Sequence, residues 1–181
     1  MIHVYDTEFL DDGRSLSLIS IGIAAEDGRE YHAVLADAPW ERVVAHDWLR
    51  ENVVPLLPGG TDPETGRWSL DAGDPRVRSR SRIAAEVEEF LLSRGEPELW
   101  ADYGAYDHVA LCGLYGAMVD LPRGIPMFTR ELRQEAASRG LEVPEMTAGA
   151  HDALEDARHV LRVLRAWGVA SGEGTRTPPG A

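Results

Sequence analysis

The chain has 181 residues, 44% hydrophobic and 27% charged, values typical of one soluble globular domain with a core of its own. Its net charge of −13 argues against a protein that grips long nucleic acid by neutralising phosphates, but allows an enzyme whose bound cations supply local positive charge. The single cysteine favours a reducing cytoplasm, and no apolar run has the length that a membrane span needs.

The first third of the chain predicts three strands and one helix. Residues 2–7 and 15–25 are strand-like, and a turn joins the second of these to a third strand at 30–35, so that the two form a hairpin. Residues 40–54 have helical spacing, with Trp48 among the side chains available for the inner face.

Residues 58–76 predict a mobile surface loop, because Gly and Pro recur throughout them. Four arginines follow in alternation, Arg76, Arg78, Arg80 and Arg82. They fit a solvated loop and helix start, or a patch that steers phosphates toward an otherwise acidic protein. Both interpretations stay open at the sequence level.

The remainder alternates helices with one strand. Helices are predicted at 81–94, 106–117, 129–139 and 152–169, with a strand at 98–101. Thr129 is the predicted N-cap of the third of these helices. Residues 1–170 thus predict a single mixed α/β domain with helices on both faces of a sheet that contains one antiparallel strand. The Gly-, Pro- and Thr-rich residues 171–181 predict a disordered C-terminal tail.

Two carboxylates end the first strand. Strand alternation puts Asp6 and Glu8 on the face that Ile2 and Val4 begin. Ligands of open α/β sheets bind at the carboxyl ends of strands, and two inward acids need a compensating charge. A divalent cation with oxygen ligands, Mg²⁺ or Mn²⁺, would compensate both, although a strand ending in solvent would also produce this pattern.

The last helix opens with a second group of polar residues. Asp152 and Glu155 have the spacing of a capping box, which makes His151 the residue before the cap and Asp156 the fourth helical residue. These two positions meet in space and usually hold an apolar contact. Here they would place an imidazole beside a carboxylate, unless the histidine simply lies on the surface.

A third acid opens the helix at 106–117. Asp107 follows a strand and a turn through Gly104, and an aspartate in the first helical turn is common for dipole reasons alone. Asp102 competes with it for the same role. The local pattern therefore indicates little by itself.

The order of these motifs resembles the DEDD exonucleases of the DnaQ-like superfamily, in the subgroup with a histidine as fifth residue. The matched residues are Asp6, Glu8, Asp107, His151 and Asp156. A closer resemblance, carried by residues 5–9, 18–22, 26–31, 104–111, 128–133 and 151–154, is to the actinobacterial polyadenylate-specific exoribonucleases. Two features depart from that family: Tyr103 stands where many members have Asn, and the 59–74 loop is longer than expected.

The resemblance implies a ribonuclease H-like fold, here a mixed five-stranded sheet flanked by helices, and a homodimer acting on adenylate-rich RNA 3′ ends. It also implies two divalent cations per active site, held by Asp6, Glu8, Asp107 and Asp156. His151 would then be the general base, because imidazole titrates near neutral pH. His108, next to Asp107, is its main rival, and His159 a supporting candidate.

Three aromatic or apolar residues are candidates for contacting the terminal nucleotide: Phe9, Leu10 and Tyr106. Aromatic rings stack on base faces, although Phe9 and Leu10 could equally pack in the core. Two other functions stay open. A DNA 3′-5′ exonuclease would use the same residues, and a noncatalytic RNA-binding protein could keep the same fold.

Overall fold

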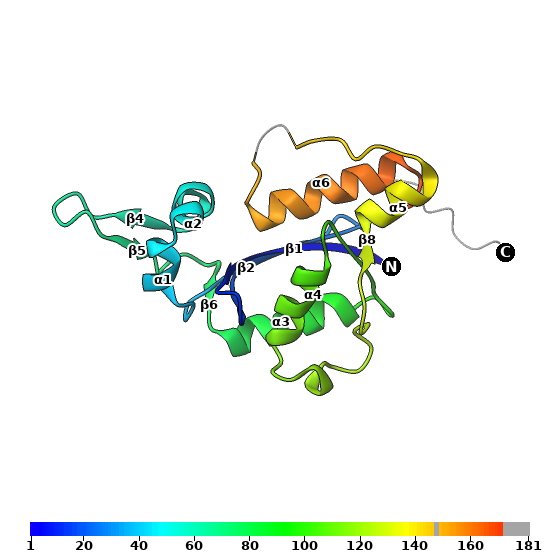
Figure 1. The fold of residues 1–181 in the computed structure, drawn as a ribbon. Helices are drawn as coiled ribbons and strands as arrows, with labels where there is room; N and C mark the ends of the chain where they lie inside the picture. The colour runs from blue at the N-terminus through cyan, green and yellow to red at the C-terminus, as the bar shows by residue number, and fades with distance from the viewer. Residues whose placement is uncertain (147–148, 172–181) are drawn as a thin grey trace.

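A computed structural model describes residues 1–146 and 149–171. Its centre is a six-stranded sheet with the order β6-β3-β2-β1-β7-β8. This sheet lies between two layers of helices (Figure 1). Apart from Ser171, the predicted C-terminal tail lies outside the described residues. Within the described part of the chain, no helix is long and apolar enough to cross a membrane.

The sheet has the mixed α/β plan of a ribonuclease H-like fold, as predicted. β2 (Leu16–Ala25) is antiparallel to both of its neighbours, β1 (Ile2–Asp11) and β3 (Glu30–Leu35), while β7 (Glu98–Ala101) is parallel to β1. The sheet has six strands rather than the five that the resemblance implies: the four predicted from the residues, and one two-residue strand at each edge. These edge strands are β6 (Val77–Arg78) and β8 (Arg130–Glu131).

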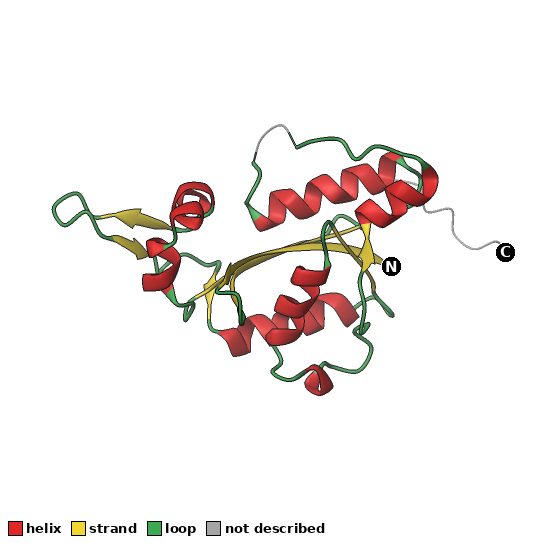
Figure 2. Cartoon of the chain, in the orientation of Figure 1, coloured by secondary structure: helices red, strands yellow, loops and turns green. Residues whose placement is uncertain are grey.

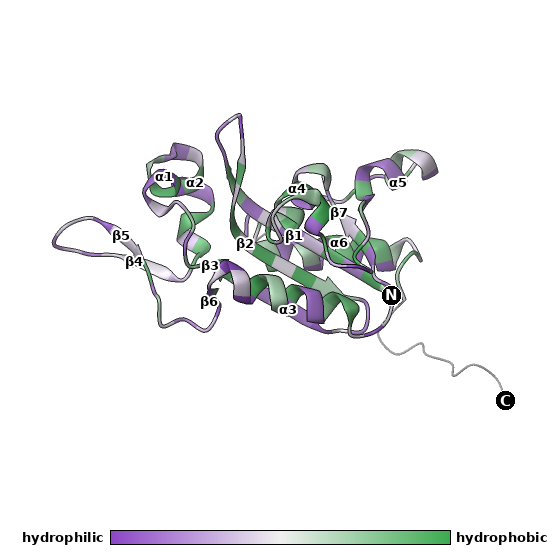
Figure 3. Cartoon of the chain, turned by 90° about the horizontal axis from the view of Figure 1, so that it is seen from below, coloured by the Kyte–Doolittle hydropathy of each residue, from purple (hydrophilic) through white to green (hydrophobic). Residues whose placement is uncertain are grey.

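Helices cover both faces of the sheet (Figure 2). On one face, α3 (Arg80–Leu92) and α4 (Ala105–Gly113) bury Tyr5 among residues of β2 and β3. On the other, α5 (Leu132–Arg139) and α6 (Ala153–Ala166) bury Ile2 and Val4. Apolar residues concentrate along β2 between these layers (Figure 3). Successive side chains of β1 alternate between these two cores, and the same alternation decides which face of the sheet its later residues point to.

The helix predicted at 40–54 is broken. α1 (Trp40–Ala45) ends at His46, whose extended backbone and ring nitrogen cap the next helix, α2 (Asp47–Asn52), and a short 3₁₀ helix, η1 (Val54–Leu56), follows. Val43 and Leu49 reach the core, but Trp48, which was predicted to be available for the inner face, does not, because 47% of it is exposed.

The predicted 58–76 loop contains a small antiparallel sheet of β4 (Gly59–Thr61) and β5 (Trp68–Leu70). It is attached to the body by an aromatic contact between Trp68 and Trp40, with ring centroids 5.3 Å apart.

The boundaries of two predicted helices also differ. α4 ends at Gly113 rather than residue 117, and a 3₁₀ helix, η2 (Met118–Asp120), follows. α5 begins at Leu132, because residues 130–131 pair with β7 before the helix starts. Its N-cap is Glu131 rather than Thr129, and Gly140 ends it in the left-handed conformation, at φ 66°.

Candidate active site

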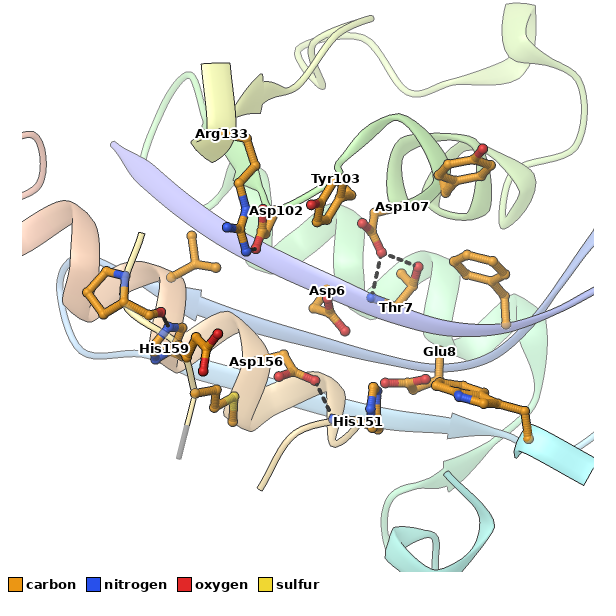
Figure 4. A pocket seen from close by; sticks show the side chains of 17 residues that line it. Asp6, Thr7, Glu8, Asp102, Tyr103, Asp107, Arg133, His151, Asp156 and His159 are labelled. Carbon is orange, nitrogen blue, oxygen red and sulfur yellow. Dashed lines mark hydrogen bonds and ion pairs between the residues drawn. The ribbon is translucent and has the colours of Figure 1, made fainter. Parts of the chain in front are cut away.

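A cavity of about 680 Å³ lies beside residues 6–9 of β1, between α4 and α6 (Figure 4). β1 continues to Asp11, so Asp6 and Glu8 lie within the strand rather than at its end, where the sequence predicted them. All five residues of the predicted motif line it: Asp6, Glu8, Asp107, His151 and Asp156. Three segments distant in the sequence therefore meet here, as the order of the motifs predicts.

A glycine brings the last helix to this place. Gly22 pairs with Asp6 in the β1–β2 register, and a Cβ at Gly22 would lie 2.3 Å from the backbone of Ala153 and Leu154. The first turn of α6 thus rests directly on the backbone of β2, where only glycine leaves room. This close approach places the residues that open α6 beside the carboxylates of β1.

The start of α6 has the predicted cap, but not the full capping box. Asp152 accepts hydrogen bonds from the backbone of Leu154 and Glu155, 3.1 Å each. Glu155 pairs with Arg158 instead of reaching back to the cap. The backbone N–H of His151 donates to Asp156 at 2.8 Å, which confirms the predicted contact between these two positions.

His151 is held in an uncommon backbone conformation, at φ 72°, a region that residues other than glycine rarely adopt. Such strain persists only where the surroundings fix it, and it gathers at functional sites. Here the hydrogen bond to Asp156 fixes the backbone.

Glu8, His151 and Asp156 form a compact set of potential ligands, with one atom from each lying within 4.8 Å of the others. Glu8 and Asp156 offer the oxygen ligands that Mg²⁺ and Mn²⁺ prefer. Asp6 lies along the same wall of the cavity (Figure 4). This donor set fits a hard divalent cation.

Asp107 is fixed from the opposite side by Thr7. One carboxylate oxygen accepts both the backbone N–H of Thr7, at 2.9 Å, and its hydroxyl, at 2.6 Å. The side chain is buried, and these bonds couple the start of α4 to β1. Asp107 therefore faces the cavity from α4, while Glu8 faces it from β1.

Burial and mutual repulsion make these acids resist ionisation. Burial raises the pKa of Glu8 to about 8, and Asp156 and Asp107 add to the shift. Burial, with Asp107 and Glu8 nearby, raises the pKa of Asp6 well above its usual range. The pKa of Asp107 rises to about 6 through burial, although its bonds from Thr7 oppose the rise. Burial also raises the pKa of Asp156.

Within residues 1–146 and 149–171, none of these four carboxylates forms an ion pair with an arginine. Clustered acids without a cationic partner need positive charge to ionise together. A divalent cation would supply it, and the chemistry of the donor set agrees.

Two of the three candidates for contacting a nucleotide lie in the cavity. Phe9 and Tyr106 stack with ring centroids 6.2 Å apart, and both line it. Leu10 does not: it is buried in a separate core cluster with Val43 and Leu49. A bulge between Glu8 and Phe9 changes the register of β1 at this point.

Sequence reasoning missed Trp48 and Arg133 as residues of the site. Trp48 lies edge-on to the His151 ring, with centroids 4.8 Å apart. Arg133 pairs with Asp102, the rival of Asp107, and both line the cavity. The helical pattern gave no signal for either residue, because the break at His46 and the start of α5 decide where they point.

The other histidines take different places. His108 is hydrogen-bonded to the Tyr5 hydroxyl at 3.2 Å, and it does not line the cavity. His159 does line it, and one of its ring nitrogens lies 2.9 Å from the carbonyl oxygen of Pro144. The structure thus places His151, and not His108, in the cavity.

The four alternating arginines lie outside the cavity. Arg76 pairs with Asp74, whereas Arg78 and Arg82 both pair with Glu86. Arg80 donates to the carbonyl of Gly113. These contacts favour a structural role over a phosphate-steering one.

No family model matches the chain. Two curated proteins named 3′-5′ exoribonuclease, from Mycobacterium tuberculosis strains CDC 1551/Oshkosh and ATCC 25618/H37Rv, are each 48% identical over 168 residues, 91% of this chain and 92% of theirs. A solved structure of the yeast NOT1 MIF4G domain co-crystallized with CAF1 matches with a TM-score of 0.47 and 9% identity, covering 92% of this chain and 80% of that one. The 48% identity extends over nearly the whole of both mycobacterial relatives, so this chain belongs to the family of these 3′-5′ exoribonucleases.

Proposed function

We propose that the protein is a metal-dependent 3′-5′ exoribonuclease that hydrolyses the terminal phosphodiester of RNA and releases nucleoside 5′-monophosphates. The observation that carries the proposal is the meeting of Asp6, Glu8, Asp107, His151 and Asp156 in one cavity. The names of the mycobacterial relatives support the same activity. The order of the five residues supports membership of the histidine-containing subgroup of DnaQ-like exonucleases.

Two divalent cations, Mg²⁺ or Mn²⁺, would supply charge stabilisation at the attacking and leaving oxygens. Asp6, Glu8 and Asp156 would hold the first, and Asp6 would also reach the second, which Asp107 would support. Bonds from Thr7 and His151 already orient Asp107 and Asp156 for this role.

His151 takes the proton from the attacking water in this proposal. Its position near Glu8 and Asp156 would also allow it to bind a cation. We assign it as base because the neighbouring carboxylates provide enough of the oxygen ligands that hard cations prefer.

Replacing His151 by alanine separates these two roles. The variant should lose roughly 10²- to 10⁴-fold in kcat, the usual contribution of a general base, and still bind Mn²⁺ with nearly unchanged affinity. Isothermal titration with Mn²⁺ and steady-state rates measure the two quantities. A large loss of Mn²⁺ affinity would make His151 a ligand instead.

The substrate class is tested with matched RNA and DNA oligomers, labelled at the 5′ end and incubated with Mn²⁺. We expect faster shortening of RNA from its 3′ end, and still faster for an oligoadenylate, a preference that rests on the resemblance to polyadenylate-specific exoribonucleases. Faster loss of DNA would favour the DNA exonuclease.

Glu8→Gln, which removes one buried carboxylate, should abolish shortening, whereas Glu51→Gln, at a side chain that is 70% exposed, should not. RNA binding without any shortening by the wild type would indicate the noncatalytic RNA-binding protein.

The same resemblance supports a homodimer, and the single Cys112 supports a cytoplasmic location. Light scattering coupled to size-exclusion chromatography measures the oligomeric state. Cell fractionation of the native host measures the location.

A further inference from the structure

One end of the cavity carries an aromatic residue that the catalytic proposal does not use. Tyr103 is 66% exposed, although its ring lies at the wall of the cavity. Its backbone has φ 56°, uncommon for a residue with a side chain. An exposed, conformationally costly aromatic residue at a site is a candidate for binding.

Arg133 lies against this ring, with its guanidinium carbon 5.2 Å from the ring centroid. The guanidinium makes a two-pronged pair with Asp102, through Nε and Nη2 at 2.7 Å each. Within residues 1–146 and 149–171, Nη1 has no protein partner. The pair thus leaves donors available while the side chain stays oriented.

A second carboxylate fixes the ring and the helix relative to each other. Glu131 accepts the backbone N–H of Tyr103 through one oxygen and that of Gln134, in the first turn of α5, through the other, both at 2.8 Å. Because Arg133 belongs to the same turn, Tyr103 and Arg133 are positioned as one unit. The unit exists without any ligand, so binding would cost little reorganisation.

Charge distinguishes this unit from the rest of the cavity. Among the described residues that line the cavity, six are acids and Arg133 is the single arginine. The six acids would repel a polyanionic strand, whereas bound cations and this guanidinium would attract it. An arginine also binds a phosphate through two oxygens, which a point charge cannot do.

The position of the unit indicates which nucleotide it would meet. Tyr103 and Arg133 lie toward one end of the cavity, and Glu8 and His151 toward the other (Figure 4). Phe9, next to Glu8, stacks on Tyr106 and is the proposed contact for the terminal nucleoside. If the scissile phosphate lies between, at the carboxylates, the strand leaves toward Tyr103.

We propose that Tyr103 and Arg133 form the subsite for the second nucleotide from the RNA 3′ end, with the base stacked on the ring and its phosphate bound by the guanidinium. This inference rests on the proposed exoribonuclease function and adds a subsite to it. It predicts that the unit contributes only to substrates that have a nucleotide upstream of the scissile bond.

The test compares two substrates of the intact protein with Mn²⁺. One is triadenylate, and the other is the p-nitrophenyl ester of adenosine 5′-monophosphate, which has no upstream nucleotide. Tyr103→Gly removes the ring and suits the positive φ, so the backbone is not strained. We expect it to raise the KM for triadenylate about 10-fold or more, the range of one lost base stack, and to leave the ester's KM and kcat unchanged. Tyr103→Phe should retain wild-type values.

Arg133→Ala should show the same dependence on the upstream nucleotide. Two control variants remove a side chain of the same kind and of similar exposure outside the cavity. Phe128→Ala removes an aromatic ring with the same 66% exposure outside the cavity, and Arg139→Ala removes an α5 arginine of similar side-chain exposure, 43% against 44%. Both controls should leave both substrates unaffected.

If Tyr103→Gly or Arg133→Ala raised KM equally for both substrates, or did not raise KM for triadenylate, the proposed subsite would be wrong. If the wild type cleaved neither substrate, the exoribonuclease proposal itself would be wrong.

Discussion

At the scale of single residues, the geometry of the proposed base depends on Trp48. The indole lies edge-on to His151, while the backbone of His151 is held by Asp156. The two contacts restrict different parts of the residue: the first restricts the ring, and the second the main chain. A base must lie within hydrogen-bond reach of the proton it removes. An imidazole that rotates freely would therefore lower the catalytic rate.

We therefore expect Trp48→Ala to lower kcat on RNA about 10-fold and to change KM much less. Trp48→Phe should recover most of the loss, because it keeps an aromatic edge beside the imidazole. Steady-state kinetics of the two variants provide the measurement. A loss confined to KM would make Trp48 a substrate contact rather than a positioning residue.

Glu8 should make the stability of the metal-free protein depend on pH. Folding raises its pKa from 4.5 to about 8, so the folded state binds more protons between these values, and stability falls as pH rises through this window. Glu8→Gln lacks this contribution. The free energy of unfolding of wild type relative to the variant should therefore decrease from pH 5 to pH 8.

Urea unfolding in EDTA measures that decrease, and a difference that stays constant across the window would contradict it. Adding Mn²⁺ at pH 8 should stabilise the wild type more than the variant, because the cation binds the ionised carboxylate.

At the scale of elements, the site depends on how closely α6 approaches β2. Gly22→Ala would put a methyl group 2.3 Å from the backbone of Ala153, so the helix or the strand must move. Overpacking of this kind costs about 1–3 kcal/mol. We expect a lower melting temperature and at least a 10-fold loss of activity, because Asp156 and His151 move with the helix.

Gly113→Ala is the control for this substitution, since a Cβ there meets nothing within 4 Å. It should leave both stability and activity close to wild type. If Gly22→Ala behaved like the control, the close approach would have no functional importance.

Some features of the elements could be predicted from the sequence alone, and others could not. Local rules predicted the contact of His151 with Asp156 and the cap at Asp152, because both depend on residues within one turn of a helix. They did not predict the break at His46 or the β4–β5 sheet. Those features depend on packing against distant residues, as Trp68 does on Trp40.

The candidate site divides in the same way. The five motif residues were found because their order resembles a known family. Arg133 was missed because its role comes from Asp102 and Tyr103, which lie about thirty residues earlier in the chain. Of the two roles left open for Leu10, the structure shows core packing, because the bulge after Glu8 interrupts the simple alternation of the strand.

At the scale of the whole molecule, the net charge of −13 should govern how the enzyme leaves its substrate. Few phosphates can be neutralised away from the cavity, so little holds the strand after each cleavage. We expect distributive degradation, in which a labelled RNA shortens as a continuous ladder. Excess unlabelled RNA added during the reaction should stop further shortening, whereas continued loss of the labelled strand would indicate processive action.

The contact between Trp48 and His151 also places a fluorescent side chain at the site. The chain has five tryptophans, and Trp48 is the one that lines the cavity among the described residues. It is 47% exposed, whereas Trp100 is almost fully buried, so the two indoles differ in their contact with water and should emit at different wavelengths. Paramagnetic Mn²⁺ or a nucleotide arriving beside His151 should quench the redder emission selectively, so the protein carries its own fluorescent reporter of occupancy.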